Sequence, residues 1–328
     1  MVSWGEVLSQ TKPTNEKWGL NGENKACILL IAFFDAYESW PTQEETVMSD
    51  KERKMKEDVA ELFNQVASTY DRIGPRFFSH FGRRLVELAQ IPRGADVLDV
   101  AAGRGAVLYP AAEQVGLHGH VVGIDLSAEM VRETAAEIKI SGLKNATMLQ
   151  MDAEQLTFPD ASFDFVLCGL SIFFFTQLQR ALNEFCRVLR PSGRVGVTTF
   201  AKDSEGSDWF REILLSYSSQ DSQTDEKQKT AAPTLDTPAE LEARLSNAGF
   251  ESIKVVKEGV DFAYKNEEEL WSSLWSHGAR RDLEQMDIYT LERFKADVFQ
   301  KVQVFRRSDG IHVPRRRVLF ALGIRSCH

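Results

Sequence analysis

A glycine-containing turn between two acidic residues is the stretch of the sequence best suited to binding a nucleotide. The apolar run 97–100 contains Asp99 and precedes Gly103 and Gly105. This pattern predicts a buried strand and a tight turn, and glycines without a Cβ let a ligand lie against bare backbone. A second apolar run ends at Asp125, 20 residues after Gly105, where doubly wound folds place an acid that accepts hydrogen bonds from ribose hydroxyls. The spacing therefore predicts a nucleotide site.

The turn lacks the features that hold phosphate groups. A dinucleotide fingerprint needs a third small residue three positions after its second glycine, and Leu108 occupies that position. No Gly-Lys-Ser/Thr sequence follows the turn, so it is not a phosphate-binding P-loop. A nucleoside without phosphates fits better, and we predict S-adenosylmethionine rather than NAD as the cofactor.

Strand-like and helical patterns alternate around the turn. After the run 97–100, further apolar runs predict strands at 121–125, 146–151, 163–169, 194–200, 251–256 and 317–322. Helical spacing fills the intervals between them, as at 106–114 and 177–189. Strands that alternate with helices predict an α/β fold built on a parallel sheet.

Five segments within residues 59–200 resemble the class I S-adenosylmethionine-dependent methyltransferases. The resemblance is closest to the ubiquinone/menaquinone-biosynthesis methyltransferases and their small-molecule relatives. Its segments are 63–71 (FNQVASTYD), 99–105 (DVAAGRG), 123–130 (GIDLSAEM), 152–153 (DA) and 187–193 (RVLRPSG). Ala101 stands where most class I enzymes have the first glycine of the turn, although the ubiquinone type tolerates alanine there. The resemblance implies a Rossmann-like, doubly wound sheet of seven strands whose last strand is antiparallel, with a helical cap or lid.

The resemblance also implies how the chain contacts the cofactor. Asp99 would order the turn and reach the ammonium group, by itself or through water, and it could also cap the next helix. Asp125 would accept hydrogen bonds from both ribose hydroxyls. Met130 would pack on the adenine, Asp152 would accept from its amino group, and the Ala153 amide would donate to a ring nitrogen. The expected cofactor-binding residues are Tyr70, Asp99, Ala101, Gly103, Gly105, Asp125, Leu126, Met130, Asp152, Ala153 and Cys168.

Aromatic residues are frequent in the segments that would surround the transferred methyl group. The run 172–175 (IFFF), after Ser171, either packs under the next helix or lines an apolar pocket for the acceptor. No Asn/Asp-Pro-Pro-Tyr/Phe motif occurs there, which argues against methylation of bases or amide nitrogens. The expected acceptor-pocket residues are Phe77, Phe78, Ser171, Phe174, Trp209, Trp271 and Trp275. We predict O- or C-methylation of an apolar small molecule, such as a phenol, an enol, a quinone-like compound or a terpenoid.

Two side chains are candidates for removing a proton from such an acceptor. The ordinary pKa of histidine, about 6.5, suits His277 as a base at neutral pH, and Asp71 is the second candidate. Trp271 and Trp275 stand four residues apart on one helix face, either as pocket walls beside His277 or as the core of a lid. The arginines at 306, 307 and 315–317 form a solvated rim or hold an anionic tail of the acceptor.

The patterns divide the chain into a core and its additions. Residues 1–54 form an extension of unknown role, whose apolar run 26–34 is interpreted as a packing helix or as an anchor to a membrane or partner. The polar stretch 218–238 is expected to be a mobile loop. The other divisions are a helical cap segment at 55–90, the cofactor-binding core at 91–258, a helical lid insertion at 259–315, and the last core strand and tail at 316–328.

Composition narrows the function classes further. The 328 residues are 43% hydrophobic and 27% charged, and the net charge of −9 argues against general nucleic-acid binding. The four cysteines form no Cys-x-x-Cys pair and no metal-binding pattern, which predicts a reduced, cytoplasmic protein without a metal site. No apolar run reaches the about 18 residues that span a membrane, so stable membrane insertion is not expected.

These features predict a small apolar acceptor as the partner, and they are compatible with a homodimer. Two other functions stay open from the sequence. One is methylation of a protein side chain. The other is a methyltransferase fold that binds the cofactor for a non-methylating role.

Overall fold

The computed structural model describes residues 49–202, 209–217, 235–260, 262–313 and 317–326 of the chain. Some of the expectations above fall on residues outside these ranges. They concern most of the N-terminal extension, including its apolar run 26–34, most of the polar stretch 218–238, and Arg315 and Arg316. Within the described ranges, no helix is both long and apolar enough to cross a membrane.

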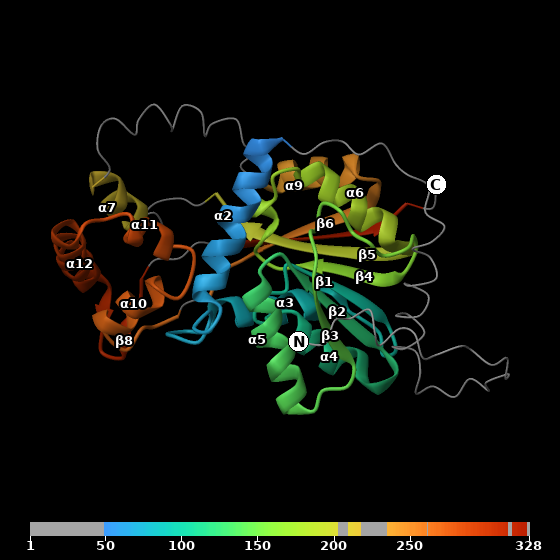
Figure 1. The fold of residues 1–328 in the computed structure, drawn as a ribbon, viewed down its shortest axis with the longest axis horizontal. Coiled ribbons are helices and arrows are strands. Elements are labelled where there is room, and N and C mark those ends of the chain that lie inside the picture. The colour runs from blue at the N-terminus through green and yellow to red at the C-terminus, as the bar shows by residue number, and fades with distance from the viewer. Residues whose placement is uncertain (1–48, 203–208, 218–234, 261, 314–316, 327–328) are drawn as a thin grey trace, which may run out of the picture. The chain divides into compact units, whose positions relative to one another are not determined.

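A sheet of seven strands organises the described chain (Figure 1). The strands are β1 (Asp96–Val100), β2 (His120–Asp125), β3 (Ala146–Gln150), β4 (Phe163–Cys168), β5 (Leu189–Phe200), β6 (Phe250–Glu258) and β9 (Val318–Arg325). Their order is β3-β2-β1-β4-β5-β9-β6. The first five strands pair in parallel, whereas β9 is antiparallel to both of its neighbours, β5 and β6. The predicted doubly wound sheet with an antiparallel last strand is confirmed.

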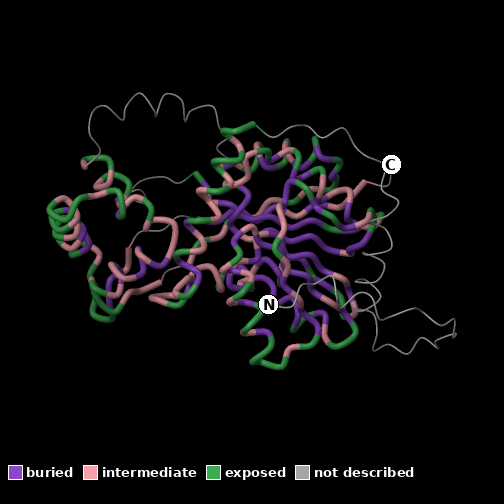
Figure 2. The backbone as a smooth tube through the Cα atoms, viewed as in Figure 1, coloured by how far each residue is buried: buried purple, intermediate pink, exposed green. Residues whose placement is uncertain are grey.

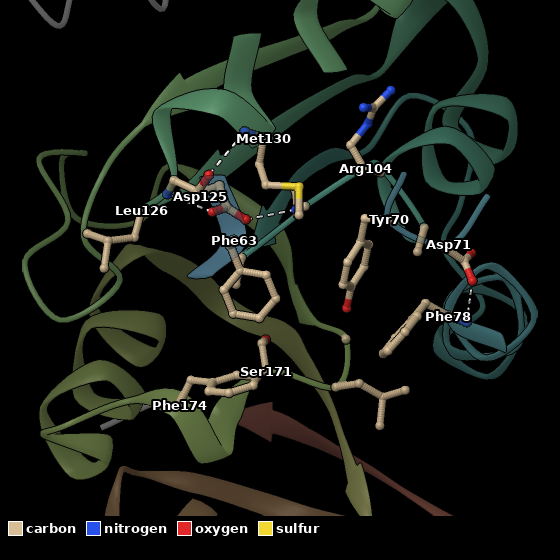
Figure 3. A pocket seen from close by; sticks show the side chains of 18 of the residues that line it. Phe63, Tyr70, Asp71, Phe78, Arg104, Asp125, Leu126, Met130, Ser171 and Phe174 are labelled. Atoms are coloured by element: carbon tan, nitrogen blue, oxygen red, sulfur yellow. Dashed lines mark hydrogen bonds between the residues drawn. The ribbon is translucent and has the colours of Figure 1, made fainter. Parts of the chain in front are cut away.

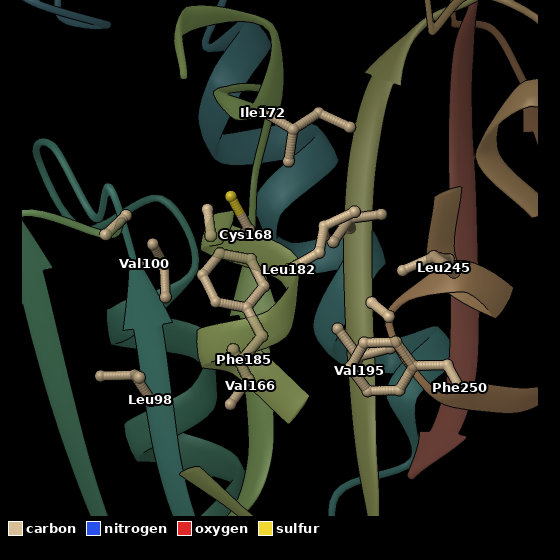
Figure 4. Close-up of a cluster of buried hydrophobic side chains, with 14 of the residues drawn as sticks. Leu98, Val100, Val166, Cys168, Ile172, Leu182, Phe185, Val195, Leu245 and Phe250 are labelled. Atoms are coloured by element: carbon tan, nitrogen blue, oxygen red, sulfur yellow. The ribbon is translucent and has the colours of Figure 1, made fainter. Parts of the chain in front are cut away.

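Helices cover both faces of this sheet, because successive strand residues point to opposite sides. Within β1, Val97 joins the hydrophobic cluster under the helices of one face, and Leu98 joins the cluster under those of the other. Figure 2 shows the central strands as largely buried, and Figure 4 shows the second of these clusters around Phe185. The helices of the first face are α3 (Phe77–Ala89), α4 (Leu108–Val115) and α5 (Ala128–Ser141), and those of the second are α6 (Leu178–Val188) and α9 (Pro238–Asn247).

Helix α2 (Asp50–Val66) begins before residue 55, where the helical pattern of the cap segment was expected to start. Its first turn is closed by a capping box. The Ser49 hydroxyl accepts a hydrogen bond from the Glu52 N–H at 3.2 Å, and the Glu52 carboxylate accepts one from the Ser49 N–H at 2.9 Å. Residues 50–54 are therefore continuous with the cap helix, which packs against α5.

The insertion expected at 259–315, called the lid below, contains a small hairpin besides its helices in its described residues, 259–260 and 262–313. Two-residue strands carry no alternation of polar and apolar residues, so the prediction of a helical insertion missed the hairpin. Helix α7 (Trp209–Tyr217) precedes β6 in the chain but packs on the lid, and Trp209 lies in the same hydrophobic cluster as Phe294. The elements of the lid are α10 (Glu267–Leu274), α11 (Arg280–Glu284), α12 (Ile288–Val302), β7 (Arg306–Arg307) and β8 (Gly310–Ile311).

Candidate cofactor and acceptor site

The predicted cofactor residues gather at the carboxyl ends of the parallel strands, where the chain order reverses between β1 and β4. The Asp125 carboxylate accepts hydrogen bonds there from the N–H of Gly103 at 2.8 Å and from the N–H of Ser127 at 2.9 Å. It thus joins the glycine turn to the start of α5 (Figure 3). Asp125 is 9% exposed, and burial raises its pKa to about 6. A carboxylate has about four acceptor positions, so Asp125 has capacity for further donors from a ligand.

The turn after β1 holds three residues in the left-handed region of backbone conformation. The angle φ is +53° at Ala101, +51° at Gly103 and +80° at Gly105. A Cβ on Gly105 would lie 2.5 Å from the Tyr109 ring, whereas a Cβ on Gly103 would meet no atom within 4 Å. Gly105 is therefore needed for close packing, and Gly103 leaves open space in front of the backbone.

Ala101 is a strained position, and we expect Ala101→Gly to stabilise the protein. Alanine at positive φ costs about 1–2 kcal/mol, which the greater entropy of glycine in the unfolded chain offsets only in part. The denaturant midpoint should rise by the equivalent of about 0.5–1 kcal/mol. Ala102→Gly is the matched control, because Ala102 is buried and outside the left-handed region, so its midpoint should fall. A lower midpoint for Ala101→Gly would contradict the assignment of strain.

These elements enclose a cavity of about 560 Å³, called the cofactor cavity below. Nine of the eleven expected cofactor-binding residues line it. They are Tyr70, Ala101, Gly103, Gly105, Asp125, Leu126, Met130, Asp152 and Ala153. The loops after β1, β2 and β3 thus converge on one space, as the spacing along the sequence predicted.

Asp99 lies behind the cofactor cavity rather than on its wall, so of the two expected contacts with a ligand, direct and through water, this position favours the second. It is 1% exposed, and neither carboxylate oxygen has a partner in hydrogen-bond geometry among the described residues. Burial and the neighbouring Asp125 raise the pKa of Asp99 well above its ordinary value, and the Leu108 N–H offsets only part of this effect. A buried carboxylate without a partner is costly unless a cationic group approaches it. The site therefore fits a ligand with a positive charge near Asp99.

Cys168 belongs to the hydrophobic core, which corrects its expected place on the cavity wall. Its side chain is fully buried in the cluster that contains Phe185 (Figure 4), and its Sγ lies 3.0 Å from the Ser171 hydroxyl. Burial raises the pKa of Cys168 to about 12. Because strand residues alternate, Cys168 points to the same face as Val166, and the residues after it form the wall instead.

Helix α2 supplies cavity residues that are not among the eleven expected to bind the cofactor. Those that line the cofactor cavity are Lys56, Val59, Ala60 and Phe63. Their spacing of three or four residues places them on one helix face, and this periodicity is the signal that could have found them. The helix therefore forms part of the cavity wall.

A second cavity of about 430 Å³, called the acceptor cavity below, adjoins the first. Eleven of its 22 described lining residues are Phe, Tyr or Trp. The expected acceptor-pocket residues on its wall are Phe77, Phe78, Phe174 and Trp209. Ser171 lines the cofactor cavity instead. The residues that line both cavities are Phe63, Tyr70, Asp71, Phe78, Leu170 and Phe174.

Trp271 and Trp275 line neither of these two cavities, so the expectation that they wall the acceptor pocket is wrong. The Trp271 ring packs on Phe294 and Phe299 of α12, with ring centroids 6.3 and 6.5 Å apart. Trp275 packs on Trp271 at 6.2 Å. The helix face that the two tryptophans share turns towards α12, so the pair forms the core of the lid.

Tyr70 and Asp71 lie between the two cavities and differ in what their side chains do. The Tyr70 ring stacks on Phe78 with centroids 4.8 Å apart, and burial raises its pKa, so the phenol stays neutral. The Asp71 carboxylate accepts a hydrogen bond from the N–H of Phe78 at 3.1 Å (Figure 3). It also accepts from the N–H of Ser79 at 2.8 Å and from the Ser79 hydroxyl at 2.5 Å. These donors belong to the first turn of α3, so Asp71 caps that helix. Its role as a base stays a prediction, which this geometry disfavours.

His277 lies on the wall of the acceptor cavity, between α10 and α11. Its Nδ1 accepts a hydrogen bond from the Ala279 N–H at 3.5 Å. Burial lowers the pKa of His277 to about 4, so the ring is neutral at physiological pH. A neutral ring that accepts at Nδ1 carries its proton on Nε2, and that nitrogen is a donor.

Comparisons with known proteins agree with this arrangement. Residues 97–193 match the family model described as "Methyltransferase domain". Nocamycin O-methyltransferase of Saccharothrix syringae is 34% identical over 228 residues, which are 67% of this chain and 81% of that protein. Aklanonic acid methyltransferase DauC of Streptomyces sp. (strain C5) is 42% identical over 144 residues, which are 44% of this chain and 66% of that protein.

A solved structure shares the fold. It is phosphoethanolamine N-methyltransferase 2 of Haemonchus contortus in complex with S-adenosyl-L-methionine. The TM-score is 0.53 at 17% identity, and the match covers 86% of this chain and 61% of that one.

Proposed function

Because the chain belongs to the S-adenosylmethionine-dependent methyltransferases, we propose that it methylates an oxygen atom of an apolar, aromatic small molecule. The observation that carries this proposal is the aromatic acceptor cavity, which shares a wall with the cofactor cavity. S-adenosylmethionine supplies a methyl group that its sulfonium already activates. The residues of the chain therefore have to hold the acceptor beside that methyl group and exclude water.

The residues of the cofactor cavity fit S-adenosylmethionine. Asp125 would accept hydrogen bonds from the ribose hydroxyls, and Asp152 from the adenine amino group. Asp99 is buried behind the wall of the cavity, so it would act on the ammonium group through water. The open space in front of Gly103 leaves room for the methionine part against bare backbone.

We expect the cofactor affinity to fall in mild acid. Ribose hydroxyls donate to the charged form of Asp125, whose pKa of about 6 is raised by burial, so binding must expel a proton below that pH. The dissociation constant of S-adenosylhomocysteine should stay constant above about pH 7 and rise by up to about tenfold per pH unit below about pH 6. Calorimetry at a series of pH values measures this. Asp125→Asn should reduce the slope, whereas a flat wild-type profile would count against a buried carboxylate as the ribose acceptor.

The walls of the acceptor cavity favour a planar molecule. Aromatic side chains pack well on flat rings and polyenes, and a volume of about 430 Å³ suits a small molecule. None of the described residues on this wall is Lys or Arg, so no described cation is placed there to hold an anionic tail. The relative from Saccharothrix syringae is named an O-methyltransferase, which supports oxygen rather than carbon as the acceptor atom.

His277 is better placed to donate a hydrogen bond to the acceptor than to remove its proton. Its Nδ1 is turned to Ala279, and its lowered pKa makes it a weak base. Asp71, the other candidate base, is engaged by three donors. We therefore propose that the acceptor oxygen is acidic in itself, as in a carboxylic acid, an acidic enol or an acidic phenol. The His277 Nε2–H then stabilises the anion.

His277→Phe and His277→Gln should have different effects. Loss of one hydrogen bond to the bound anion costs about 1.5–3 kcal/mol, so His277→Phe should raise KM for the acceptor by about tenfold to 100-fold. The effect falls on KM rather than kcat, because the negative charge disappears as the methyl group is transferred. Glutamine donates through its amide and should retain most of the acceptor affinity, although it cannot act as a base. Steady-state assays give KM and kcat, and cofactor affinity should not change in either variant. An equal loss of kcat in both variants would show that His277 is a base.

The proposed reaction is tested with S-adenosylmethionine labelled in its methyl group. The protein is incubated with a panel of aromatic hydroxy and carboxylic acids and, separately, with a mixture of denatured proteins. We expect label in an O-methylated small molecule and none in protein. Label in protein alone would favour a side-chain methyltransferase. Tight binding of the cofactor without transfer to any acceptor would favour a non-methylating role.

A further inference from the structure

Helix α2 places one lysine between two acidic side chains of the loop after β3. Lys56 Nζ lies 2.6 Å from Asp152 Oδ2 and 2.5 Å from Glu154 Oε2. The Lys56 side chain is 14% exposed and that of Glu154 is 4% exposed. Burial disfavours the charged ammonium, but its bonds to Asp152 and Glu154 outweigh this and raise the pKa of Lys56. The lysine is therefore a fixed positive charge at the wall of the cofactor cavity.

The partners of Lys56 are themselves held in place. Glu154 also accepts hydrogen bonds from the Thr176 hydroxyl and the Gln177 N–H, each at 2.9 Å. Asp152 Oδ1 accepts from the Glu154 N–H at 2.9 Å. Each Asp152 oxygen thus has one donor from the protein, so the plane of this carboxylate is set from both sides.

Further contacts tie the α2 region to the other loops of the cofactor cavity. The Asn64 side-chain oxygen accepts hydrogen bonds from the Ser127 hydroxyl at 2.7 Å and from the Glu129 N–H at 3.1 Å, just after Asp125. Arg104, within the glycine turn, donates to the Ala67 carbonyl at 2.6 Å. A set of contacts therefore docks α2 over all three loops, and Lys56 is the member of this set that reaches the loop after β3.

We propose that Lys56 is the positioning residue for the adenine base. It orients the Asp152 carboxylate to accept a hydrogen bond from the exocyclic amino group of adenine. Recognition of the base therefore depends on docking of α2. The inference rests on the proposed function, through the contact between Asp152 and adenine. A carboxylate held in this way rejects a base that presents an oxygen at the same position, because two acceptors then face each other. Lys56 thereby determines selectivity for an adenosyl over an inosyl group.

The test compares the affinities of S-adenosylhomocysteine and S-inosylhomocysteine by calorimetry on the full chain. Lys56→Met should weaken S-adenosylhomocysteine binding about tenfold or more, and should lower the ratio of the two affinities about fivefold or more. Lys56→Arg keeps a cation and should restore most of the ratio. Lys54→Met is the matched control, because Lys54 lies on the same helix with 69% of its side chain exposed and pairs with Asp58. It should change neither value.

The outcomes separate this inference from the proposed function. If Lys56→Met weakens both ligands equally, or weakens neither, Lys56 does not position Asp152, although the cofactor assignment stands. If the wild-type protein does not bind S-adenosylhomocysteine, the proposed function itself is overturned. Lys56→Ala, which also removes the donor to Asp152 and favours the helix, provides the same ratio should Lys56→Met fail to fold.

Discussion

Asp125→Ala should weaken the binding of S-adenosylmethionine about 100-fold. The carboxylate would accept both ribose hydroxyls, and two hydrogen bonds to a charged acceptor contribute about 1.5 kcal/mol each, which together amount to about two factors of ten. The same substitution removes the acceptor of the Gly103 and Ser127 N–H groups, so the denaturant midpoint should fall as well. Calorimetry with S-adenosylmethionine and S-adenosylhomocysteine measures the first effect, and denaturant unfolding measures the second.

A matched control separates binding from stability in this experiment. Asp164 also accepts a hydrogen bond from a backbone N–H, that of Asp96 at 2.8 Å, but it does not line the cofactor cavity. Asp164→Ala should therefore lower stability while cofactor affinity stays near the wild-type value. Unchanged affinity in Asp125→Ala would remove Asp125 from the cofactor site.

Gly103→Ala should lower cofactor affinity more than tenfold with only a small loss of stability. The added methyl group meets no atom of the protein within 4 Å, so it enters the cavity space that the cofactor needs. The turn has little freedom to retreat, because the Gly103 N–H is held by Asp125 and its carbonyl accepts from the Thr134 hydroxyl at 2.8 Å. The strain of alanine at φ +51° should lower stability by about 1 kcal/mol.

Gly94→Ala provides the control for that strain. Gly94 has φ +83°, and a Cβ there also meets no atom within 4 Å, but Gly94 precedes β1 and does not line the cofactor cavity. Both variants should lose a similar amount of stability, and only Gly103→Ala should lose affinity. If the two variants bind the cofactor equally well, the ligand does not lie against the glycine turn.

The sequence by itself determined the parallel part of the sheet and most of the predicted residues that line the cofactor cavity. The apolar runs at 97–100 and 121–125 differ from β1 and β2 by one residue at their starts. Gly103, Gly105 and Asp125 were identified because the spacing of a turn and an acid is a property of nearby residues. Strand alternation and turn conformation depend on steric contacts between residues that are close in the sequence. The order of residues is therefore enough to predict them.

The tertiary structure decided which side chains reach the cavities. Asp99 and Cys168 both stand at or near strand ends, but one is sealed behind the cavity and the other is turned into the core. Lys56 meets Asp152 across 96 positions of the chain, and no short-range pattern marks that pair. Which of two faces borders a cavity depends on what packs over it.

The roles of the lid residues could be predicted least from the sequence, because they depend on packing between distant segments. Helical spacing placed Trp271 and Trp275 on one face, but α12 covers that face, so the tryptophans became lid core and His277 was left on the wall of the acceptor cavity. Helix α7 packs in the same hydrophobic cluster, although it precedes β6 in the chain and the lid follows β6. The periodicity of apolar residues predicts which residues share one face of a helix or strand. What that face meets, and hence its burial and the pKa values of its groups, follows only from the contacts between distant segments.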